Sequence, residues 1–176
     1  MVQENLEEEF LEDSKWKKIF VKVSSIFLLL LILSYFLVSY PLFPILESIF
    51  ESETSKENKI VVGNLSVDFN EASYLAVQEL YKQDQSVEFA ACLTGKKEFN
   101  AYSISEVYQP EIIEQTFNHV SFKSCDKNTL ILLHSHPYRR CIASEQDLIT
   151  LNRTKQNNPD ILMVIMCEPN RFSIYQ

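Results

Sequence analysis

The chain has 176 residues, 46% of them hydrophobic, and a formal net charge of -8. Binding to nucleic-acid phosphates requires clustered lysine and arginine, and the C-terminal two thirds carry no basic stripe, so a general nucleic-acid-binding role is excluded. Only two glycines occur, Gly63 and Gly95, which excludes a glycine-rich phosphate loop. The length suits one domain with its own core and a short appendage.

The N-terminal region divides into a polar tail and an apolar segment. Residues 1–18 are charged and lack apolar periodicity, which is typical of a solvated tail or a short polar helix. Residues 19–46 contain a single charged residue, Lys22, and no polar face. A bilayer core needs about 20 apolar residues, so this segment predicts one transmembrane helix. A cleaved signal peptide is the alternative, but the run is long for one and no A-x-A cleavage site follows.

The lysines flanking the apolar segment bear on its orientation. On its N-terminal side are four lysines: Lys15, Lys17, Lys18 and Lys22. The first lysines after it are Lys56 and Lys59. The positive-inside bias places the N-terminus in the cytoplasm and the main domain outside.

Residues 47–59 are polar and predict a linker, and residues 60–176 predict the folded domain. Helices are expected after Asn70, as far as Lys82, and from Ser144 to Thr154. The expected strands are Val87–Thr94, Glu98–Val107, Phe117–Lys123, Thr129–Leu133, Ile161–Met166 and Phe172–Tyr175. Strands mixed with helices predict an α/β (α+β) domain.

The four cysteines are widely spaced and include no C-x-x-C pair, which excludes a zinc ribbon and a thioredoxin motif. They are Cys92, Cys125, Cys141 and Cys167. Their tendency to be buried favours reduced thiols, whereas a domain facing an oxidising space would allow disulfides.

A candidate metal site follows the apolar strand Thr129–Leu133. His134 and His136 lie two positions apart, so on an extended segment both imidazoles point the same way. Asp147 follows in the first turn of the helix that Ser144 caps, where it can face back towards the strand end. Two imidazoles and one carboxylate leave a fourth zinc position open for water, the arrangement of catalytic sites. The remaining histidine, His119, alternates with apolar neighbours and is expected to be solvent-facing or structural.

The order of these residues resembles the JAMM (MPN+) signature E…H-[ST]-H-x7-S-x-x-D. Seven residues separate His136 from Ser144, and two separate Ser144 from Asp147. Upstream, Glu88 matches the glutamate of the family's E-x-x-G-x-L-x-G segment, with its leucine and second glycine also in register. Two small departures occur. Ala91 stands where the family has glycine, and Ala143 stands where many prokaryotic members have proline. Cys141 occupies a position where related deubiquitinases carry cysteine, and is interpreted as packing.

The resemblance implies a JAMM/MPN, cytidine-deaminase-like fold over residues 60–176, with a mixed β-sheet flanked by helices, and one zinc ion. By this resemblance His134, His136 and Asp147 are the zinc ligands, and two further residues take part in catalysis. Glu88 would be the general acid/base and Ser144 the hydrogen-bond donor to the oxyanion. Ser135 would have a supporting role.

The resemblance implies a zinc metalloprotease, a peptidase or isopeptidase acting on a protein or peptide substrate, with a ubiquitin-like C-terminal tail as the expected target. The alternative is a non-catalytic MPN scaffold in a membrane-associated complex. A zinc deaminase is excluded because its H-x-E and P-C-x-x-C motifs are missing. Such a modifier and free cysteines fit the cytoplasm, whereas the lysine bias places the domain outside, so the side of the membrane stays open.

Overall fold

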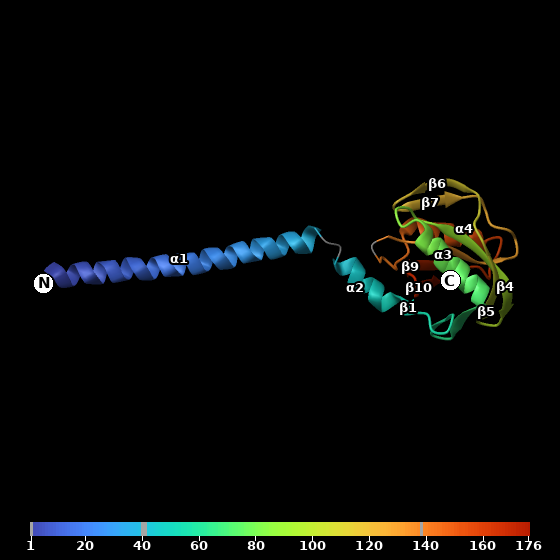
Figure 1. The fold of residues 1–176 in the computed structure, drawn as a ribbon, viewed down its shortest axis with the longest axis horizontal. Helices are drawn as coiled ribbons and strands as arrows, with labels where there is room; N and C mark the ends of the chain where they lie inside the picture. The colour runs from blue at the N-terminus through green and yellow to red at the C-terminus, as the bar shows by residue number, and fades with distance from the viewer. Residues whose placement is uncertain (1, 40–41, 138) are drawn as a thin grey trace. The chain divides into compact units, whose positions relative to one another are not determined.

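A computed structural model describes residues 2–39, 42–137 and 139–176 of the chain. The chain divides into two compact units, Met1–Leu42 and Phe43–Gln176, which are described separately. Figure 1 shows the long N-terminal helix and the sheet-rich domain.

The first unit is the helix α1, Val2–Ser39. Its segment Lys15–Ser39 is 25 residues long and apolar enough to cross a membrane, and none of it is buried within the protein. At 1.5 Å per residue it spans about 37 Å, more than a bilayer core requires. By length and composition a signal sequence would pass the same test.

These boundaries differ from the predicted tail at 1–18 and membrane span at 19–46. The polar N-terminal residues continue the same helix, and a second helix, α2, covers Leu42–Glu51.

The segment 47–59, predicted as a linker, contributes helix and strand to the second unit. The first residues of this segment form the last turn of α2. The strand β1, Glu53–Thr54, then pairs with β10, Arg171–Tyr175, in antiparallel register. The hydroxyl of Ser48, only 1% exposed, accepts the backbone N–H of Cys141 at 3.0 Å. The polar composition of this segment therefore serves hydrogen bonds within the domain, and the compact unit begins before residue 60.

An eight-stranded mixed sheet forms the centre of the second unit, in the order β1-β10-β9-β8-β4-β5-β3-β2. Most neighbouring strands are antiparallel, whereas β8 pairs with β9 and β3 with β5 in parallel. The remaining strands of this sheet are β2 (Lys59–Val62), β3 (Leu65–Phe69), β4 (Ala90–Glu98), β5 (Ala101–Tyr108), β8 (Thr129–Ser135) and β9 (Leu162–Glu168). A separate hairpin joins β6 (Ile112–Thr116) to β7 (His119–Phe122). The predicted mixed α/β architecture is confirmed, while β1, β2, β3 and β6 were not predicted.

The two predicted helices of the domain are confirmed and lie on opposite faces of the sheet. Asn70 caps α3, Glu71–Gln83, and Val77 of this helix packs into the larger apolar core. Ser144 caps α4, Glu145–Lys155, whose Leu151 packs against Leu132 in a smaller core on the other face.

Alternation along β8 decides which face receives the candidate site. Ile131 and Leu133 point into the larger core under α3, and Leu132 points into the smaller core under α4. His134 and His136 share the parity of Leu132, so they emerge on the α4 face. Ser135 points the other way, and its hydroxyl accepts the backbone N–H of Phe89 at 3.0 Å, which ties the end of β8 to the segment before β4.

Gly95 stands at an irregularity in the β4–β5 pairing where no side chain fits. A Cβ atom there would lie 2.0 Å from the carbonyl oxygen of Ser103, a backbone atom that cannot move aside. We expect Gly95→Ala to lower the free energy of unfolding by about 3 kcal/mol because it forces two central strands apart. Gly63→Ala is the control: its Cβ meets nothing within 4 Å, but the φ of 59° costs about 1 kcal/mol. Chemical unfolding of the full chain in detergent checks both, and equal losses would contradict this account.

Candidate metal centre

Two buried imidazoles meet at the end of β8. His134 is 5% and His136 8% exposed, and their Nε2 atoms are 3.1 Å apart. Backbone hydrogen bonds hold this strand end on both sides, because Ser135 donates to Phe89 O at 3.0 Å and His136 donates to Met166 O at 3.1 Å. The two rings are therefore fixed by the sheet rather than by a flexible loop.

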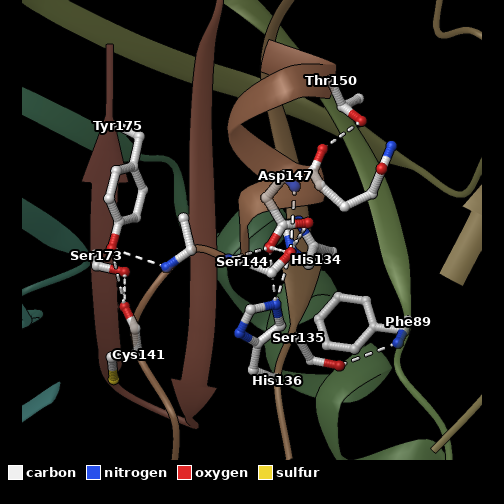
Figure 2. Close-up of polar contacts among 12 residues, drawn as sticks. Phe89, His134, Ser135, His136, Cys141, Ser144, Asp147, Thr150, Ser173 and Tyr175 are labelled. Atoms are coloured by element: carbon white, nitrogen blue, oxygen red, sulfur yellow. Dashed lines mark hydrogen bonds and ion pairs between the residues drawn. The ribbon is translucent and has the colours of Figure 1, made fainter. Parts of the chain in front are cut away.

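The carboxylate of Asp147 reaches the same point from α4 (Figure 2). Its Oδ1 lies 3.2 Å from Nε2 of His134 and its Oδ2 lies 3.2 Å from Nε2 of His136. A capping box holds the carboxylate in place, since Oδ2 accepts both the backbone N–H and the hydroxyl of Ser144 at 2.7 Å. The same contacts that begin the helix thus orient the third candidate ligand.

Electrostatics favour an ionised Asp147. Burial acts to raise its pKa, but hydrogen bonds from both imidazoles and from Ser144 lower the pKa well below the ordinary value of an aspartic acid. A carboxylate that stays charged at any physiological pH is a suitable ligand for a divalent cation.

The spacing of the three side chains fits one metal ion. His134, His136 and Asp147 offer ligand atoms that all lie within 4.8 Å of one another. Two donors bound to one tetrahedral zinc ion at about 2.0–2.1 Å each would lie about 3.3 Å apart, close to the 3.1 and 3.2 Å observed. Deprotonated nitrogen and oxygen atoms approach this closely only around a shared cation or shared protons. Two imidazoles and a carboxylate without thiolate match the donor set of catalytic zinc.

Glu88 lies two residues before the start of β4 and is 6% exposed, so it is not an exposed strand residue. Its backbone N–H donates to Thr116 O at 2.9 Å, and its carbonyl accepts the side-chain amide of Gln115 at 2.7 Å, which ties it to the β6–β7 hairpin. Burial raises the pKa of Glu88 to about 7. The charges of His136 and Arg140 oppose this shift, and that of Asp147 adds to it. A carboxyl that titrates near neutrality can both accept and return a proton.

Ser144 combines its capping role with proximity to the candidate ligands. Its hydroxyl donates to Oδ2 of Asp147 and accepts the backbone N–H of Asp147 at 3.2 Å. A hydrogen bond from Ser144 to a substrate oxyanion would therefore replace the one to Oδ2. His119, predicted to be solvent-facing or structural, lies exposed on β7.

The expectation of reduced thiols is wrong in this structure, where all four cysteines are paired. Cys92 is bonded to Cys125, and Cys141 to Cys167. The Cα atoms of the two pairs are 5.9 and 5.2 Å apart, ordinary separations for disulfides. Spacing along the chain could not reveal these pairs, because strand pairing brings together residues separated by 33 and 26 positions.

The second disulfide belongs to a set of contacts that hold the segment between His136 and Ser144, and sequence reasoning missed them. The carbonyl of Cys141 accepts the hydroxyls of Ser173 and Tyr175, and its N–H donates to Ser48 (Figure 2 shows the first two). Tyr175 also accepts the N–H of Ala143 at 2.9 Å. Since this segment leads from the second imidazole to the capping box, these contacts set the distance between the candidate ligands.

Comparisons with known proteins carry no argument about this chain. No protein-family model matches this chain, and no curated protein matches it. Among solved structures, the chain is similar to a JAB1/MPN domain protein from Archaeoglobus fulgidus, with 21% identity and a TM-score of 0.41. The match covers 61% of this chain and 87% of that protein. Because a likeness this weak carries no argument about activity, the functional case depends on the site itself.

The raised pKa of Glu88 generates a prediction for the metal-free protein. A carboxyl whose pKa rises from 4.5 to about 7 on folding contributes its full stability below pH 4.5 and loses it as the pH passes through 7. Glutamine does not ionise, so Glu88→Gln should gain stability over the parent between pH 5 and pH 8, by at most about 3 kcal/mol. Thermal unfolding of the full chain in chelator across this range measures the difference. Glu79→Gln, an exposed α3 position, is the control, and parallel profiles for Glu88→Gln and the parent would contradict the prediction.

The two disulfides form a matched pair for testing the contacts that hold the segment between His136 and Ser144. Removing Cys141–Cys167 by C141S/C167S should lower zinc affinity about tenfold, because it loosens the support of the ligands. Removing Cys92–Cys125 by C92S/C125S should lower the free energy of unfolding by about 2–4 kcal/mol but leave zinc affinity close to that of the parent. Competition with a fluorescent chelator measures affinity on the full chain. Equal affinities for the two double variants would contradict a positioning role for Cys141–Cys167.

Proposed function

We propose that this chain is a zinc-dependent peptidase or isopeptidase of the JAMM (MPN+) type, a metalloprotease tethered to a membrane by its N-terminal helix. The observation that carries the proposal is the convergence of His134, His136 and Asp147 within 4.8 Å of one another, on the face of the sheet that α4 covers. Glu88, a buried carboxyl whose pKa responds to His136 and Asp147, supplies an acid/base beside them.

In this proposal His134, His136 and Asp147 hold the zinc ion. Bound zinc would supply Lewis acidity and lower the pKa of a water molecule to about 7. Glu88 accepts the proton of the attacking water and returns it to the leaving amine, and its pKa of about 7 suits both transfers. Ser144 turns its hydroxyl from Oδ2 of Asp147 to the developing oxyanion.

The scissile bond is a peptide or isopeptide bond of a protein substrate. The C-terminal tail of a ubiquitin-like modifier is the substrate class that the sequence resemblance implies, since such tails are extended and bind beside a strand. Which substrates reach the site depends on the side of the membrane that the domain faces.

Metal analysis and hydrolysis of the purified full chain test this proposal. We expect about one zinc ion per chain, its loss in His136→Ala, and its retention in His119→Ala, the control at an exposed histidine. Glu88→Gln should keep the metal but lose about 10²–10⁴-fold in the rate of cleavage of peptide or isopeptide-linked substrates, because the proton acceptor is gone.

A folded parent chain that binds no zinc would overturn the proposal and favour the non-catalytic scaffold. A Glu88→Gln variant that is as active as the parent would contradict the assigned acid/base.

A further inference from the structure

We propose that the folded domain works on the oxidising side of the membrane, outside the reducing cytoplasm, and cleaves polypeptides of that compartment rather than cytosolic modifier conjugates. The substrate class rests on the proposed hydrolase, whereas the side of the membrane rests on independent observations.

The first observation is the complete pairing of the cysteines. Cys92 and Cys125 join β4 to the loop before β8, and Cys141 and Cys167 join the candidate site to β9. Disulfides form and persist in oxidising spaces and are reduced by the thiol systems of the cytoplasm. A chain with four cysteines and no free thiol is therefore suited to an exported domain.

The second observation is that one pair supports the site itself. Cys141 lies between His136 and Ser144, and its disulfide fixes this segment to β9 together with the hydrogen bonds from Ser173 and Tyr175. In a reducing space this covalent support would be lost at the place where the distance between the candidate ligands is set. The oxidised state is thus part of the arrangement that the proposed activity uses.

The third observation is the charge around the apolar helix. Four lysines lie in or before the N-terminal part of the candidate span: Lys15, Lys17, Lys18 and Lys22. The first positive residue after the span is Lys56, so the bias retains the N-terminus in the cytoplasm and sends the domain across. A cleaved signal sequence would deliver the domain to the same side, so both interpretations of the helix lead to one location.

These observations resolve the conflict over the side of the membrane. Free cysteines had favoured the cytoplasm, and the structure contains none. The remaining argument for the cytoplasm is the modifier substrate, which only the sequence resemblance implies. The lysine bias and both disulfides agree on the opposite side, so the substrates are polypeptides outside the cytoplasm.

Two measurements on the full chain in cells test the location. Rapid acid quenching, denaturation and alkylation with a high-mass maleimide count free thiols: we expect none before chemical reduction and four after it. The variant C92S/C125S should show none before and two after. Alkaline phosphatase, which folds only in oxidising spaces, should be active when fused after the exposed C-terminal Gln176.

Free thiols in most of the quenched chains, or a phosphatase that is inactive although the fusion accumulates, would overturn the proposed location. Neither readout depends on hydrolysis, so their failure leaves the hydrolase untouched. Conversely, a chain that binds no zinc would overturn the hydrolase and leave the thiol count as expected. A third experiment adds a peptide substrate and an impermeant chelator to intact cells. Loss of peptide cleavage in the chelator would support both the hydrolase and its outward-facing site, whereas cleavage that resists the chelator would contradict the outward-facing site.

Discussion

The carboxylate of Asp147 is the constraint on which the candidate site depends, because it satisfies two demands at once. It closes the capping box with Ser144 that begins α4, and it faces both imidazoles at 3.2 Å. An N-cap fixes the start of a helix to within a residue, so the sequence spacing between Ser144 and Asp147 becomes a spatial position. The strand supplies the other two groups at a fixed spacing because side chains alternate across it.

The surrounding protein keeps these two elements in register. His134 and His136 are bound to the sheet through backbone hydrogen bonds, whereas α4 packs on the sheet through the small core around Leu151 and is joined to it by the chain before Ser144. The disulfide Cys141–Cys167 and the hydroxyls that bond Cys141 secure that intervening chain. Helix α2 takes part through Ser48, so the segment that precedes β1 belongs to the support of the candidate site.

Local signals made part of this structure predictable from the sequence. The caps Asn70 and Ser144, the apolar run before His134 and the two-residue spacing of the histidines each depend on neighbouring residues, and the corresponding elements were found. The strand β3 alternates Leu65, Val67 and Phe69 but is short, and its pairing with distant β5 stabilises it. The hairpin strand β6 is mostly exposed and shows little apolar pattern.

The contacts missed around the site share one property, which is that they join residues far apart in sequence. Ser48 and Cys141 are 93 positions apart, and the cysteine pairs become visible only once the strand order is known. Likewise the burial of Glu88, which raises its pKa to about 7, arises from tertiary packing and could not be predicted from the neighbouring sequence. The residue types of the site were readable from the sequence, while their electrostatics and support were not.

X-ray absorption at the zinc edge of the metal-loaded full chain tests the central claim most directly. The account predicts a first shell of nitrogen and oxygen at about 2.0 Å with the outer-shell scattering of two imidazoles and no sulfur. Sulfur at about 2.3 Å, or a shell without imidazole scattering, would contradict a site built from His134, His136 and Asp147.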